Sequence, residues 1–85
     1  MALYAGHVVD VVFTVEPFVV GNPGPHVLAA VDAVRAHGVQ VEFGPFGSTF
    51  SVDATGVGKV VGALLDAAYA NGATQVTVQV GGREP

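Results

Sequence analysis

Residues 7–16 constrain the fold more than any other segment, because this run of β-branched side chains is apolar on both faces of the strand that it predicts. Val9, Val11, Phe13 and Val15 point to one side, and Val8 and Val12 stand among the polar residues of the other. A strand with two largely apolar faces belongs in the interior of a sheet. Pro17 ends this strand, since proline has no N–H to donate to a neighbour.

Two later segments have the spacing of amphipathic helices. The first runs from about residue 25 to 37 and places Val27, Ala30, Val31 and Val34 on one face. Gly38 is expected to end it by adopting a left-handed conformation. The second runs from about residue 57 to 71, with Asp53 or Thr55 as the expected N-cap. Its apolar face consists of Val57, Val60, Val61, Leu64 and Ala68.

Three further segments alternate as strands do. Residues 39–44 and 49–53 predict a hairpin around Gly-Pro-Phe-Gly-Ser, and residues 75–80 alternate valine with glutamine or threonine. The predicted order β-α-β-β-α-β is that of a ferredoxin-like α+β sandwich, a four-stranded antiparallel sheet with both helices on one face. At 85 residues the chain forms one domain, spanning 1–85 with its core at about 7–80.

Composition predicts self-association. Hydrophobic residues make up 51% of the chain and charged residues only 12%, which leaves more apolar surface than a small monomer buries. The sheet face away from the helices is predicted to carry mostly Thr, Gln, Ser and Val. Such a mixture is typical of contact with another subunit or a ligand, although an ordinary exposed face is the alternative. We expect a homo-oligomer, either a dimer or a tetramer.

Charge and residue type disfavour several classes of function. The net charge is −4, and Arg35, Lys59 and Arg83 lie far apart in the sequence, so nucleic-acid binding is not expected. Acidic residues interrupt every candidate membrane span, and the N-terminus does not resemble a secretory signal, so we expect a cytoplasmic protein. The chain has no cysteine and no paired histidines, which predicts no metal site. No catalytic motif or cofactor motif is recognised, and we expect no enzymatic activity.

Polar and aromatic residues near the predicted loops are the candidates for ligand binding. Glu16 ends the first strand beside Phe18, and Phe46 lies in the hairpin. A carboxylate near an aromatic face suits a ligand cation, whereas a solvated carboxylate and packed phenylalanines are the alternative. We expect the two loops to lie at opposite ends of the sheet, so both need not line one pocket within one subunit, and subunit pairing is a way to bring them together.

Three stretches resemble the small thiamine-binding proteins related to YkoF. They are Val12-Phe-Thr-Val-Glu-Pro-Phe18, Pro23-Gly-Pro-His26 and Val41-Glu-Phe-Gly-Pro-Phe-Gly-Ser-Thr49, within a likeness that covers about residues 8–80. The resemblance implies a ferredoxin-like fold, oligomers, and non-catalytic binding of thiamine or a related pyrimidine. The family pattern places Glu-Gly after the hairpin threonine, where this chain has Ser51 and Val52, so Asp53 is the residue available to supply that carboxylate.

The ligand site implied by the resemblance contains Glu16, Phe18, Phe46, Gly47, Ser48 and Thr49. These residues offer a carboxylate, aromatic faces and hydroxyl groups, which suit a thiazolium cation joined to an aminopyrimidine. Because basic residues are few, unphosphorylated thiamine is expected to bind better than its diphosphate. The expected role is a carrier, buffer or sensor. The alternative is an oligomeric regulatory or structural module that senses another small metabolite.

Overall fold

The central strand of the sheet is β1 (Val8–Glu16), as its two apolar faces predict. The computed structural model describes residues 7–17, 23–44 and 47–82. Within this part of the chain, β1 pairs antiparallel with β3 (Gly47–Asp53) on one side and with β4 (Gln75–Gly82) on the other. The short strand β2 (Glu42–Gly44) pairs antiparallel with β3. The sheet order is therefore β2-β3-β1-β4.

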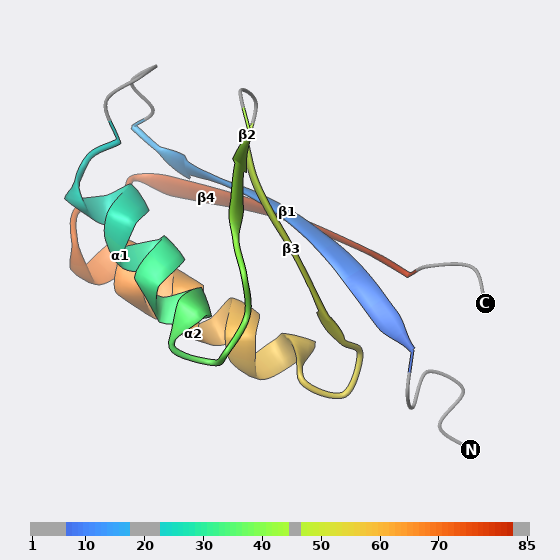
Figure 1. Ribbon diagram of the computed structural model, residues 1–85. Coiled ribbons are helices and arrows are strands. Elements are labelled where there is room, and N and C mark those ends of the chain that lie inside the picture. The colour runs from blue at the N-terminus through green and yellow to red at the C-terminus, as the bar shows by residue number, and fades with distance from the viewer. Residues whose placement is uncertain (1–6, 18–22, 45–46, 83–85) are drawn as a thin grey trace.

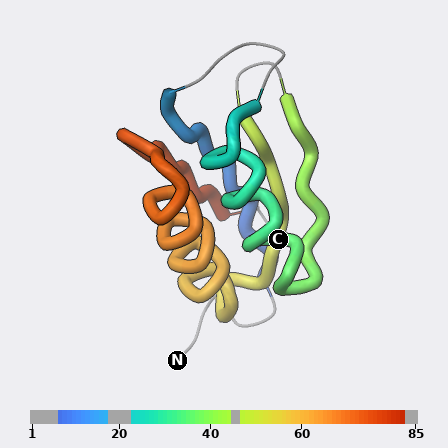
Figure 2. The backbone as a smooth tube through the Cα atoms, turned by 90° about the vertical axis from the view of Figure 1, so that its left-hand side faces the viewer, coloured from blue at the N-terminus to red at the C-terminus, as the bar shows by residue number. Residues whose placement is uncertain are grey.

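Two helices cover one face of this sheet (Figures 1 and 2). They are α1 (Pro25–Arg35) and α2 (Val57–Ala70), which complete the element order β-α-β-β-α-β. The predicted ferredoxin-like α+β fold is confirmed. No helix in the described part of the chain is long and apolar enough to cross a membrane.

The core lies between the sheet and the helices, and it contains the side chains that the periodicities place there. The buried side chains of β1 face both helices, and the rings of Phe13 and Phe50 meet edge to face with their centroids 5.9 Å apart. The predicted faces of both helices are buried or partly buried. The cluster of buried side chains is Val11, Phe13, Val15, Val27, Ala30, Val31, Val34, Val41, Phe50, Val60, Leu64 and Ala68.

Element ends differ from the predictions where local backbone bonding decides them. The expected side-chain N-cap of α2 is wrong, because Gly56 occupies that position and no side chain caps the helix. Instead, the Gly56 N–H donates to the Asp53 carbonyl at 2.9 Å, so a backbone turn leads into the helix. α1 ends at Arg35, two residues before its predicted end, with Ala36 as its C-cap. Gly38 does adopt the predicted left-handed conformation, with φ of 77°, and its N–H donates to the Arg35 carbonyl.

The two edge strands differ from their predicted lengths in opposite directions. β2 has three residues, because only Glu42–Gly44 reach β3, whereas Val39 and Val41 pack onto the core from the segment before it. β4 has eight residues and continues through Gly81 and Gly82, which pair with Asp10 and Val9 of β1. Strand pairing therefore extends beyond the alternating pattern at one edge and stops short of it at the other.

Replacing Gly62 with alanine is expected to stabilise the protein by about 0.5–1 kcal/mol, because alanine restricts the unfolded chain and favours the helix. Gly62 lies inside α2, and a Cβ there would meet no described atom within 4 Å. Urea unfolding followed by circular dichroism measures the change. Gly38→Ala is the matched control and should destabilise, because φ is +77° there although the space is also open. A loss of stability in Gly62→Ala would contradict the open surface of α2.

Candidate functional site

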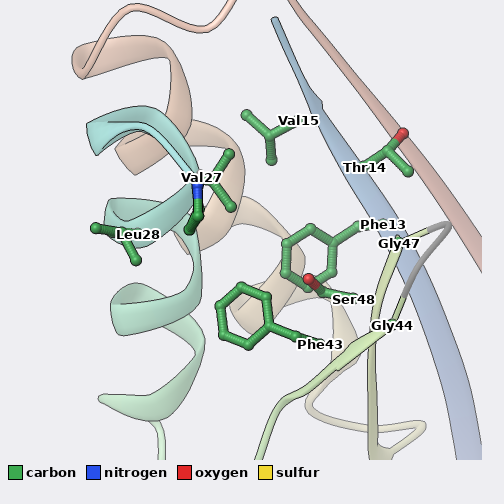
Figure 3. A pocket seen from close by; sticks show the side chains of 10 residues that line it. Phe13, Thr14, Val15, Val27, Leu28, Phe43, Gly44, Gly47 and Ser48 are labelled. Atoms are coloured by element: carbon green, nitrogen blue, oxygen red, sulfur yellow. The ribbon is translucent and has the colours of Figure 1, made fainter. Parts of the chain in front are cut away.

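A cavity of about 400 Å³ lies between the start of α1, the end of β1 and the base of the β2–β3 hairpin (Figure 3). This volume is in the range of small-molecule sites. Five segments of the chain contribute to its wall. The described lining residues are Phe13, Thr14, Val15, Pro23, Val27, Leu28, Phe43, Gly44, Gly47 and Ser48.

The expectation that the end of β1 and the hairpin lie at opposite ends of the sheet is wrong. Because β1 and β3 are antiparallel, the last part of β1 lies beside the first part of β3, and Phe13 is paired with Ser48. The end of β1, the start of α1 and the described base of the hairpin therefore meet at one end of the molecule (Figure 2). A single chain forms the cavity without a second subunit.

Three side chains in a row across the strands form the sheet side of the cavity. Ser48 of β3 is paired with Phe43 of β2 and with Phe13 of β1, and opposed residues in antiparallel strands point to the same face. Phe13 is buried, Ser48 is 6% exposed, and Phe43 at the sheet edge is 52% exposed. The close-up shows the two rings beside each other with the Ser48 hydroxyl near them (Figure 3).

The helix side of the cavity comes from the first turn of α1. Val27 is buried, whereas Leu28 is 47% exposed and, like Phe43, leaves apolar surface in contact with solvent. His26 donates from Nε2 to the Pro17 carbonyl oxygen at 2.6 Å and thereby joins the start of the helix to the residue that follows β1. This hydrogen bond holds the two segments that supply Val15 and Leu28 to the wall.

The hairpin base is held close by two glycines. A Cβ on Gly44 would lie 2.8 Å from the Gly47 carbonyl oxygen, and a Cβ on Gly47 would lie 3.1 Å from the Phe13 carbonyl oxygen. Side chains at these positions would therefore push β2, β3 and β1 apart. The two glycines allow the close backbone approach that sets Phe43 and Ser48 beside Phe13.

The Ser48 hydroxyl is the polar group best placed to meet a ligand. The structure shows no hydrogen-bond partner for it among the described residues, yet no fully buried side-chain oxygen there lacks a partner. The hydroxyl oxygen is therefore not completely buried, although Ser48 as a whole is only 6% exposed, and Ser48 is one of the residues that line the cavity. Thr14 is the second polar lining residue, and its hydroxyl points away from the two rings (Figure 3). None of the described lining residues is charged.

The structure brings only part of the predicted site together. Gly47 and Ser48 line the cavity. Glu16 is exposed at the end of β1, and Thr49 is exposed on the sheet face opposite to Ser48; neither is among the lining residues. Phe18 and Phe46 lie outside the described residues.

Asp53 and Ser51, which the family resemblance singles out, lie away from the cavity. Asp53 lies at the far end of β3, where it pairs with Val8, and Ser51 donates to the Asp10 carboxylate at 2.6 Å on the outer face. Phe13, Phe43 and Leu28 line the cavity, although none of them is among the ligand-site residues predicted from the sequence. Phe13 and Phe43 are identified as residues of the site because both are paired with Ser48. This pairing can be recognised only when the register of the strands is known.

Replacing Ser48 with alanine is expected to leave stability unchanged or raise it by up to about 1 kcal/mol, because the hydroxyl has no described partner to lose and its surroundings are apolar. Ser51→Ala is the matched control in the same strand and should lower stability, since its hydroxyl bonds Asp10. Urea unfolding of both variants measures the difference. A marked loss in Ser48→Ala would show that the hydroxyl holds the fold together.

Comparisons with known proteins extend the fold assignment. Neither protein-family models nor curated proteins match the sequence. Among solved structures, a domain of unknown function, DUF77, from Bacillus cereus aligns with 93% of this chain and 77% of its own, at 22% identity and a TM-score of 0.57. A protein from Streptococcus pneumoniae aligns with 92% of this chain and 87% of its own, at 20% identity and a TM-score of 0.55. At these identities the likeness shows a shared ferredoxin-like fold.

Proposed function

We propose that this protein is a non-catalytic binding protein for a small planar heteroaromatic molecule, and that thiamine or its pyrimidine moiety is the ligand. The observation that carries the proposal is the cavity with Phe13 and Phe43 on either side of the Ser48 hydroxyl. Its role would be that of a carrier, buffer or sensor.

The lining residues suit the pyrimidine half of the ligand. A flat ring gains contact with the exposed face of Phe43 and with Leu28, both of which lose solvent exposure when it binds. The Ser48 hydroxyl can donate to a ring nitrogen or accept from the exocyclic amino group. Because this hydroxyl has no described partner in the free protein, bonding a ligand costs no internal hydrogen bond.

The charges favour an unphosphorylated ligand. The lining residues that the structure describes include no arginine or lysine to bind a phosphate. The net charge of −4 favours a cation over an anion, and the exposed carboxylate of Glu16 stands at the same end of the sheet as the cavity. Thiamine bound by its pyrimidine would direct its thiazolium ring toward solvent, at the end of the sheet where Glu16 is exposed.

Isothermal titration calorimetry with thiamine, the isolated pyrimidine and thiamine diphosphate tests the proposal. We expect saturable binding of thiamine, weaker binding of the diphosphate, and an affinity reduced about tenfold in Ser48→Ala by loss of one hydrogen bond. Phe43→Ala should reduce affinity at least as much, because it removes the exposed aromatic wall. Circular dichroism spectra establish that each variant is folded.

Thr49→Ala is the matched control, because Thr49 adjoins Ser48 but faces the other side of the sheet. Unchanged affinity in this variant, with losses in the other two, places the ligand in the cavity. The reverse pattern would move the ligand to the outer face. Absence of heat with all three compounds would reject thiamine, and a thermal-shift screen in which another metabolite stabilises the protein would then favour a regulatory module.

A further inference from the structure

β4 leaves one long edge of the sheet unpaired. It is the last strand in the order β2-β3-β1-β4, and its eight residues pair with β1 on one side only. Along its other side, no described segment accepts or donates backbone hydrogen bonds in a strand pairing. The opposite edge of the sheet is formed by β2, which has three residues and includes the charged Glu42. The sheet therefore has one short, charged edge and one long, uncharged edge.

Two features that keep natural sheet edges apart, proline and charged side chains, are absent from β4. Its sequence, Gln-Val-Thr-Val-Gln-Val-Gly-Gly, contains no proline and no charged residue. Val80 is paired with Val11 and so faces the helix side of the sheet, yet it remains 50% exposed. In Figure 1 the C-terminal end of β4 extends past the helices. An uncharged edge strand with an exposed valine is a template for another strand.

We propose that β4 pairs with β4 of a second copy of this chain, antiparallel and across a two-fold axis, so that the two four-stranded sheets become one continuous sheet. This interface satisfies the free backbone groups of both edges. It places the helices of both copies on the same face, since a two-fold axis perpendicular to the sheet does not exchange its faces.

Symmetry restricts the register of this pairing. Opposed residues in antiparallel strands point to the same face. The two-fold axis must therefore set one residue of β4 opposite the same residue of the second copy, because an axis midway between two residue positions would oppose side chains that point to different faces. An axis at Val78 sets valine against valine at Val76, Val78 and Val80, and sets Thr77 against Gln79 of the other copy. An axis at Gln79 would set Val76 against Gly82 and lose one of these apolar contacts. The Val78 register is therefore favoured.

A second copy suits this edge better than a different partner because β4 complements itself. Each copy of the chain has a net charge of −4, which opposes self-association at charged surfaces, but β4 sets no charge against its symmetry mate. Its alternation of valine with threonine and glutamine is preserved on both faces when the strand pairs with itself. A charged or proline-containing peptide would gain neither advantage.

The interface is independent of the proposed ligand. β4 and the β2–β3 hairpin lie at opposite edges of the sheet, so the cavity stays open in both copies. Failure of thiamine binding would leave the pairing of β4 unaffected, and the converse also holds.

Sedimentation velocity over roughly 1–100 µM protein tests the pairing and its register with two double variants. Thr77→Lys with Gln79→Lys sets lysine against lysine twice in the dimer, and should weaken association by about tenfold or more. Thr77→Lys with Gln79→Glu instead sets lysine against glutamate twice, and should associate at least as tightly as the wild type. Thr77 and Gln79 are both exposed on the outer face, so the monomer should remain folded in both double variants.

Thr49→Lys is the control, because it adds a charge to the same face of the sheet but not to β4. Dimers that are weakened only by the double lysine variant support the interface. The proposal is overturned by a wild-type protein that stays monomeric throughout, by equal association of the two double variants, or by greater weakening in Thr49→Lys. The last result would place the contact on the sheet face.

Discussion

The antiparallel pairing of β1 with β3 is the contact on which the rest of the structure depends. It places β1 inside the sheet, where its buried side chains meet both helices, and it sets Phe13 opposite Ser48. A slip of one residue would turn Phe13 and its neighbours in β1 to the outer face. The same slip would remove Phe13 from its place opposite Ser48, so the core and the cavity both depend on a single register.

The cavity exists because burial is incomplete at one corner of the sandwich. Phe13, in the central strand, is covered by the helices, whereas Phe43 faces the same way from a short edge strand and remains half exposed. Leu28 of α1 is left exposed in the same region. Apolar side chains that cannot complete a core form a concave surface for a ligand instead.

Hydrophobic periodicity predicted every helix and strand, and the buried faces of β1, α1 and α2, because those faces depend on local spacing. It did not predict the cavity, which depends on non-local pairing. Phe43 alternates as a strand residue should, but its sequence carries no sign that its face would be left uncovered. The α2 cap was predicted wrongly for a related reason, since a backbone bond from Gly56 competes with the side chains of Asp53 and Thr55.

The hydroxyl of Ser48 has a consequence for selectivity. A hydroxyl rotates freely and serves equally as donor or acceptor, whereas an amide or a carboxylate imposes one polarity on its partner. A cavity that offers this group against aromatic and aliphatic walls distinguishes ligands mainly by outline and thickness, and hardly by the order of heteroatoms around their rings. Rings of the same outline that offer a hydrogen-bond donor in place of an acceptor at this point should therefore compete for the same space.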